Sequence, residues 1–113
     1  MYLPVPDEAI WVGVIRMVIH IPGARTLKDR RRAVHSLVDR IKARHHCAAA
    51  DVGHLENAGA AVISAAVVGN EARHVRSRLD AVRGEADRFG DAYLAEVTLW
   101  VQRMGEPGAD PIA

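Results

Sequence analysis

IWVGVIRMVIHI, residues 10–21, is the longest apolar run of the chain and is rich in valine and isoleucine. Residues of these types favour β-strands. In such a strand Arg16 and His20 share one face. The other face carries Trp11, Ile15, Met17, Ile19 and Ile21. Pro22 and Gly23 end the run. The pattern predicts a central strand that is apolar on both faces.

A helix is predicted directly after this strand. Thr26 stands where an N-cap belongs, and Asp29 follows three residues later, as in a capping box. Apolar residues then recur at helical spacing and form one stripe, which predicts a helix from about Leu27 to about His45. The stripe consists of Leu27, Val34, Leu37, Val38 and Ile41.

The other elements are predicted from similar signals: strands at residues 47–54, 60–68 and 91–103, and a helix at residues 70–90. Asn70 is expected to cap this second helix, and Gly90 to end it. The segment CAAADV, at the start of the second strand, would also tolerate a helix because alanine is a poor strand former.

The order β-α-β-β-α-β predicts an α+β, ferredoxin-like fold. We expect a four-stranded antiparallel sheet with the first and third strands in its centre and both helices on one face. Residues 10–103 would form this single domain, between an N-terminal extension at 1–9 and a disordered tail at 104–113. The last strand is expected to turn Tyr93, Ala95, Val97, Leu99 and Val101 to the core.

Composition supports one globular domain. The chain has 113 residues, of which 50% are hydrophobic and 26% charged, with a net charge of +1, and this balance excludes a disordered protein. Cys47 is the only cysteine, so an internal disulfide is impossible and a reducing compartment is expected. No secretory signal is recognised, and the longest apolar run is too short to span a membrane. The expected location is the cytoplasm.

Two motifs carry a resemblance to a known family. TLKDRR at residues 26–31 and DVGH at residues 51–54 are similar to the YlxP-like family of small bacterial proteins of unknown function. The similarity covers about residues 10–101. It implies a ferredoxin-like fold and genes close to those of translation and ribosome-maturation factors, but no reaction. The chain departs from the family pattern in its N-terminal extension, at residues 45–47 and at residues 58–60.

Charge is distributed unevenly along the chain. Residues 25–46 contain eight Lys or Arg and two Asp, a net charge of +6, so the rest of the chain carries −5 of the total of +1. Such one-sided charge is typical of nucleic-acid contact, where cations replace counterions on phosphates. A solvated helix face is the alternative. The residues expected to contact RNA are Lys28, Arg31, Arg32 and Lys42.

The loop before the first helix is a candidate anion site. Gly23, Arg25, Thr26 and Arg30 surround a helix N-terminus, whose free N–H groups attract phosphate. Arg30 falls on the apolar side of the helical wheel, so it is expected either to extend past the core edge or to point into this loop. Acylphosphatases share this fold, but their glycine-rich loop signature is missing, and we predict no enzymatic activity.

Potential metal ligands are present, but not at the spacing of a known zinc motif. They are His45, His46, Cys47 and His54. His45 and His46 are expected to act as cations at the helix C-terminus, since their charge complements the helix dipole. No metal, cofactor or catalytic residue is predicted.

The outer face of the sheet is expected to be apolar, with Val12, Val14, Val18, Leu94 and Trp100 forming a patch larger than monomers usually expose. This predicts a homo-oligomer, such as a homodimer. Two hypotheses follow. The chain is a non-catalytic accessory protein that binds RNA or ribosomes through its first helix, or it is an oligomeric scaffold or a protein that binds a small anionic ligand.

Overall fold

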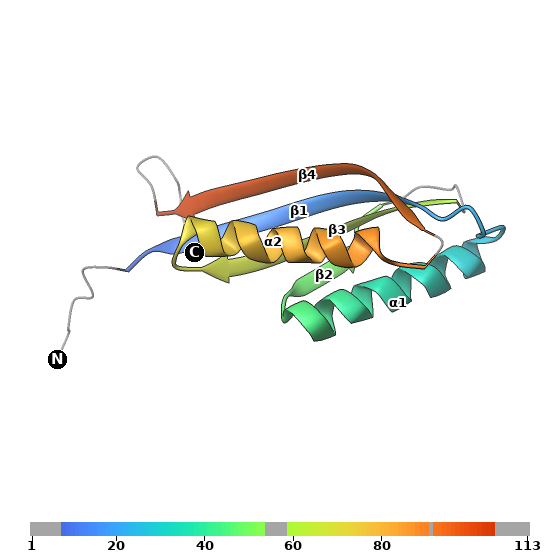
Figure 1. Cartoon of the computed structure of the whole chain (residues 1–113), viewed down its shortest axis with the longest axis horizontal. Coiled ribbons are helices and arrows are strands. Elements are labelled where there is room, and N and C mark those ends of the chain that lie inside the picture. Colours follow the sequence, from blue (N-terminus) through green and yellow to red (C-terminus); the bar gives the residue numbers. More distant parts are fainter. Residues whose placement is uncertain (1–7, 54–58, 91, 106–113) are drawn as a thin grey trace.

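A computed structural model describes residues 8–53, 59–90 and 92–105. Its elements run in the order β-α-β-β-α-β, which confirms the predicted α+β, ferredoxin-like fold (Figure 1). They are β1 (Ile10–His20), α1 (Leu27–His45), β2 (Ala48–Asp51), β3 (Ala60–Gly69), α2 (Ala72–Asp87) and β4 (Tyr93–Met104).

The four strands form one antiparallel sheet in the order β2-β3-β1-β4, so β1 and β3 are central, as predicted. Met17 in the middle of β1 lies opposite Ile63 of β3 on one side and Val97 of β4 on the other. Both helices cover the same face of the sheet (Figure 1). α1 packs against β2 and β3, while α2 packs against β1, β3 and β4.

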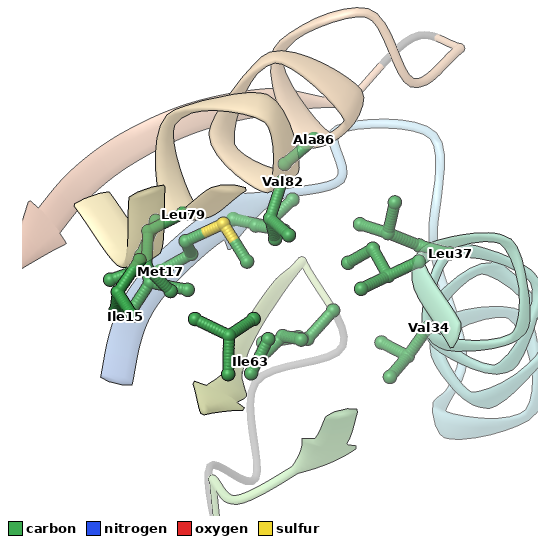
Figure 2. Packing of buried hydrophobic residues seen from close by; sticks show 14 residues of the cluster. Ile15, Met17, Val34, Leu37, Ile63, Leu79, Val82 and Ala86 are labelled. Atoms are coloured by element: carbon green, nitrogen blue, oxygen red, sulfur yellow. The ribbon is translucent and has the colours of Figure 1, made fainter. Parts of the chain in front are cut away.

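The core lies between the helices and this face, where side chains from the sheet meet those of both helices (Figure 2). Ile15 and Met17 of β1 are fully buried, as the alternation of the strand predicts. Above them, Leu79 and Val82 of α2 are also fully buried. The predicted stripe of α1 holds for Val34, Leu37 and Ile41, whereas Leu27 is 46% exposed.

The last strand differs from its predicted pattern. Val18 lies opposite Glu96, but the next residue, Ile19, lies opposite Leu94, so Ala95 is an extra residue in a β-bulge. A bulge reverses which side chains face the core. The prediction that Tyr93 and Ala95 face the core is therefore wrong, whereas Val97, Leu99 and Val101 do pack against it.

Leu94 is the second correction that this bulge causes. It packs against the core instead of lying on the outer sheet face, where it was expected. Tyr93 takes the outer position instead and stacks on His20, with 5.2 Å between the ring centroids.

The ends of the other elements agree with the sequence in part. The hydroxyl of Thr26 accepts a hydrogen bond from the N–H of Asp29 and caps α1, as predicted. The N-cap of α2 is Glu71, without a side-chain hydrogen bond, rather than Asn70. Gly90 lies just beyond α2 with a positive φ of 49°, a conformation that glycine adopts easily. β2 is shorter than predicted and ends at Asp51.

Candidate functional site

Four cations lie on the exposed side of α1 and form what we call the α1 basic ridge: Lys28, Arg31, Arg32 and Lys42. They come to the surface because the opposite side of the helix carries the buried residues Val34, Leu37 and Ile41. None of the four forms an ion pair with a described residue, whereas the exposed Arg76 of α2 pairs with Asp80 at 3.7 Å. The ridge therefore presents four cations that are available to a partner.

Three of these cations lie beside a groove between α1 and β2. This α1–β2 groove has a volume of about 570 Å³. Its wall is apolar at Val34 and Val38, and Asp51 lines it from the end of β2. Its complete described lining is Lys28, Arg31, Arg32, Val34, His35, Val38 and Asp51. The sequence predicted the cations, but not that they would border a cavity.

Arg30 takes neither of the two positions expected for it. Its side chain is only 8% exposed and lies between α1 and the hairpin of β2 and β3. Nε donates a hydrogen bond of 2.8 Å to the carbonyl oxygen of Ala60, and Nη2 lies 3.2 Å from Oδ2 of Asp51. These internal partners occupy the guanidinium, so Arg30 is a structural residue and does not face the loop before the helix.

The predicted anion loop is therefore only partly assembled. Gly23, Arg25 and Thr26 are exposed at the N-terminus of α1, but without Arg30. The carboxylate of Asp29 accepts a hydrogen bond of 3.1 Å from the N–H of Arg25. A negative charge from the chain itself already lies at this helix end, and it would repel a bound anion.

The pKa of Asp29 reflects these contacts. It lies below its ordinary value of 3.8 because the N–H of Arg25 and then the hydroxyl and N–H of Thr26 stabilise the carboxylate, and the charge of Arg32 adds to this; desolvation opposes the shift. Asp29 therefore remains ionised near neutral pH. A hollow of about 390 Å³ lies beside it, and its described lining includes Gly23 and Arg32 but neither Arg25 nor Arg30.

The candidate metal ligands that the structure describes do not converge. Within residues 8–53, 59–90 and 92–105, no group of three His, Cys, Asp or Glu side chains could hold a metal ion. His46 is the left-handed C-cap of α1, and burial raises the pKa of the half-buried thiol of Cys47. His54 lies outside the described residues.

The role of Glu85 could not be foreseen from the sequence. This α2 carboxylate is buried, with Nε2 of His45 at 3.2 Å and Nη1 of Arg44 at 3.4 Å. The cluster joins the C-terminal turn of α1 to α2. His45 thus has a partner in the neighbouring helix in addition to its place at the end of α1.

The outer sheet face is apolar towards one end. Its large exposed side chains there come from three adjacent strands and are Ile10, Val68, Trp100 and Met104, between 45% and 63% exposed. Arg16 and Glu96 share the face and form an ion pair between β1 and β4 at 3.7 Å. Such a patch is typical of surfaces that bind another protein.

No helix within the described ranges is long and apolar enough to cross a membrane. Together, the elements and the groove define a small α+β protein with a ferredoxin-like fold and a basic cleft at the edge of its sheet. Residues 12–99 match the model of a family of proteins of unknown function, DUF503, and the chain belongs to this family. Among curated proteins, none matches the chain.

Proposed function

We propose that this chain is a non-catalytic accessory protein of the bacterial cytoplasm that binds structured RNA, in particular ribosomal RNA, through the α1 basic ridge. The observation that carries the proposal is the lack of internal ion-pair partners, among the described residues, for four cations on one helix. Lys and Arg side chains without an internal ion pair can replace counterions along a phosphate backbone. The resemblance to the YlxP-like family supports ribosomal RNA as the target, since the genes of that family lie near those of translation factors.

The geometry of the ridge suits phosphate contacts. Lys28, Arg31 and Lys42 follow one side of α1 at helical spacing, so their charges lie along one line. Arginine reaches phosphate oxygens with two N–H groups at once, which favours Arg31 and Arg32 as the strongest contacts. RNA recognition by base stacking on the sheet is disfavoured, because β1 and β3 present no Phe, Tyr or Trp at the centre of the outer face.

The proposal is tested by co-sedimentation with purified ribosomal subunits at low salt. We expect the wild-type protein to sediment with a subunit and the double variant Arg31→Ala, Arg32→Ala to remain in the supernatant. The matched control replaces Arg73 and Arg83, two exposed arginines of α2, by alanine and removes the same charge. Equal sedimentation of both variants, or none of the wild type, would contradict the proposal.

The second candidate function is that of an oligomeric scaffold, with or without a small anionic ligand. The exposed patch of Ile10, Val68, Trp100 and Met104 favours it, because a second copy of the chain could cover these side chains. A homodimer that associates through the outer sheet face would leave the α1 basic ridge exposed on both copies. The two candidate functions are therefore compatible.

A further inference from the structure

β2 is an edge strand, and its free side adjoins the α1–β2 groove. The N–H of Val52 bonds to the carbonyl of Val62 at 2.9 Å, which makes these two residues a hydrogen-bonded antiparallel pair. In such a ladder the bonding direction alternates from residue to residue. The register then places Ala50 in a bonded pair with Ser64, so that Ala49 and Asp51 direct their N–H and C=O groups away from β3.

These outward groups form a short template for another strand. Natural edge strands are often protected by lysine, proline or a bulge, but the described part of β2 reads AAAD. The carboxylate of Asp51 does not protect the edge either, because Arg30 holds it. Within residues 8–53, 59–90 and 92–105, no backbone hydrogen bond to the free side of Ala49 or Asp51 is found.

The groove next to this edge is basic at one end and apolar at the other. Because α1 and β2 run in opposite directions, the N-terminal half of α1 lies along the end of β2, where Arg30 meets Asp51. A strand added to β2 would therefore meet Lys28 and Arg31 near Asp51 and the apolar wall of Val34 and Val38 further along α1.

We propose that the α1–β2 groove binds an extended, acidic segment of a partner protein, which adds to the sheet as a fifth strand beside β2. Main-chain hydrogen bonds to Ala49 and Asp51 would supply affinity, and alternate side chains would supply specificity. On the side of the partner segment that faces α1, its apolar residues would contact Val38 and its acidic residues would contact Arg31. A second copy of the chain is disfavoured, because pairing of two β2 edges would bring two basic rims together.

Binding of such a segment does not require RNA, and the main probe is a peptide alone. The probe is the peptide Thr-Val-Thr-Val-Thr-Glu-Thr-Glu, blocked at both ends, with the valines and glutamates on one face of a strand. The reversed sequence is tested in parallel, since an edge accepts strands of either direction. The readouts are affinity at low salt and hydrogen-exchange protection of the amides of Ala49 and Asp51.

We expect one of the two peptides to bind and to protect both amides. A version with lysine in place of glutamate should bind at least about tenfold more weakly. In an extended peptide, alternate backbone N–H groups point to opposite edges. Methylation of the nitrogens along the edge that pairs with β2 should abolish binding, whereas methylation of those along the opposite edge should not. Arg31→Glu should weaken binding about tenfold, and the matched control Arg73→Glu on α2 should not change it.

Three results would overturn the proposal. The first is that neither peptide binds, or that the lysine version binds as well. The second is that a uridine octamer, but no peptide, perturbs the amides of Ala49 and Asp51, which would assign the groove to nucleic acid. The third is that these amides are protected in the free protein in proportion to its concentration, which would assign the edge to a second copy. The first and third results leave open whether the α1 basic ridge binds ribosomal RNA, whereas the second would support RNA binding, because three cations of the ridge line this groove.

Discussion

The guanidinium of Arg30 in α1 and the carboxylate of Asp51 in β2 form an ion pair, with Nη2 3.2 Å from Oδ2. The two residues belong to TLKDRR and DVGH, the most distinctive motifs of the sequence. Their contact fixes the first turns of α1 against the edge strand and so determines one end of the α1–β2 groove.

Replacing Arg30 by alanine should destabilise the protein by about 2–3 kcal/mol, because the carbonyl of Ala60 would lose its donor and the partly buried carboxylate of Asp51 would lose its counter-charge. Urea denaturation measures this change in the free energy of unfolding. The control is Arg31→Ala at the exposed neighbouring position, where we expect a change within about 0.5 kcal/mol. Similar losses for both variants would show that Arg30 has no structural role of its own.

Asp29 should make stability depend on pH. Its pKa in the folded protein is lowered below 3.8, chiefly by the N–H of Arg25, so the unfolded state binds the proton more readily. The stability that this carboxylate contributes is present above pH 3.8 and is lost as the pH falls through the lower pKa of the folded state. The difference in unfolding free energy between wild type and Asp29→Asn should therefore shrink on acidification. A difference that stays constant in urea titrations at each pH would refute this.

Gly13 should not tolerate a side chain. It lies in the buried face of β1 under α2, where an added Cβ would overlap Val75 Cγ1 and come within 2.8 Å of Leu79 Cδ1. Gly13→Ala is expected to cost about 1–3 kcal/mol through overpacking. Gly23→Ala serves as the control, since nothing lies within 4 Å of its added Cβ, and its thermal midpoint should stay close to that of the wild type. If the two midpoints fall equally, the packing of α2 on β1 is looser than described.

The outer sheet face should mediate self-association. At micromolar concentration we expect the wild type to sediment as a dimer and the double variant Val68→Thr, Trp100→Gln to sediment as a monomer, because the two substitutions remove the most exposed side chains of the apolar patch. Leu27→Gln is the matched control, since Leu27 is exposed to a similar degree but lies on α1. A monomeric wild type would contradict this prediction.

Much of the fold could be predicted because local signals agree with the global arrangement. The apolar run of β1, the cap at Thr26 and the stripe of α1 each indicate the element that the structure shows. The bulge at Ala95 could not be predicted, because Tyr93, Leu94 and Ala95 are all apolar and fit either face of the strand, and only pairing with β1 reveals the extra residue. The inward turn of Leu94 and the stack of Tyr93 on His20 follow from that pairing.

The cations of the candidate site could be predicted from the sequence, but the groove beside them could not. The sequence placed Lys28, Arg31 and Arg32 on the exposed side of a helix, and they lie there. It could not show that β2 would end beside them and leave a groove, because this depends on contacts between residues far apart in the chain. The buried position of Arg30 was missed for the same reason: its partners are 21 and 30 residues away.

The salt dependence of RNA binding shows whether the α1 basic ridge contacts phosphates. Affinity for a structured ribosomal RNA fragment is measured over a series of salt concentrations for three proteins. They are the wild type, the double variant Arg31→Ala, Arg32→Ala and the α2 control, the double variant Arg73→Ala, Arg83→Ala. We expect loss of Arg31 and Arg32 to reduce the slope of log K against log salt by about 0.7–0.9 per lost contact, while the control variant leaves the slope unchanged. Equal slopes for all three proteins, or no binding at low salt, would contradict it.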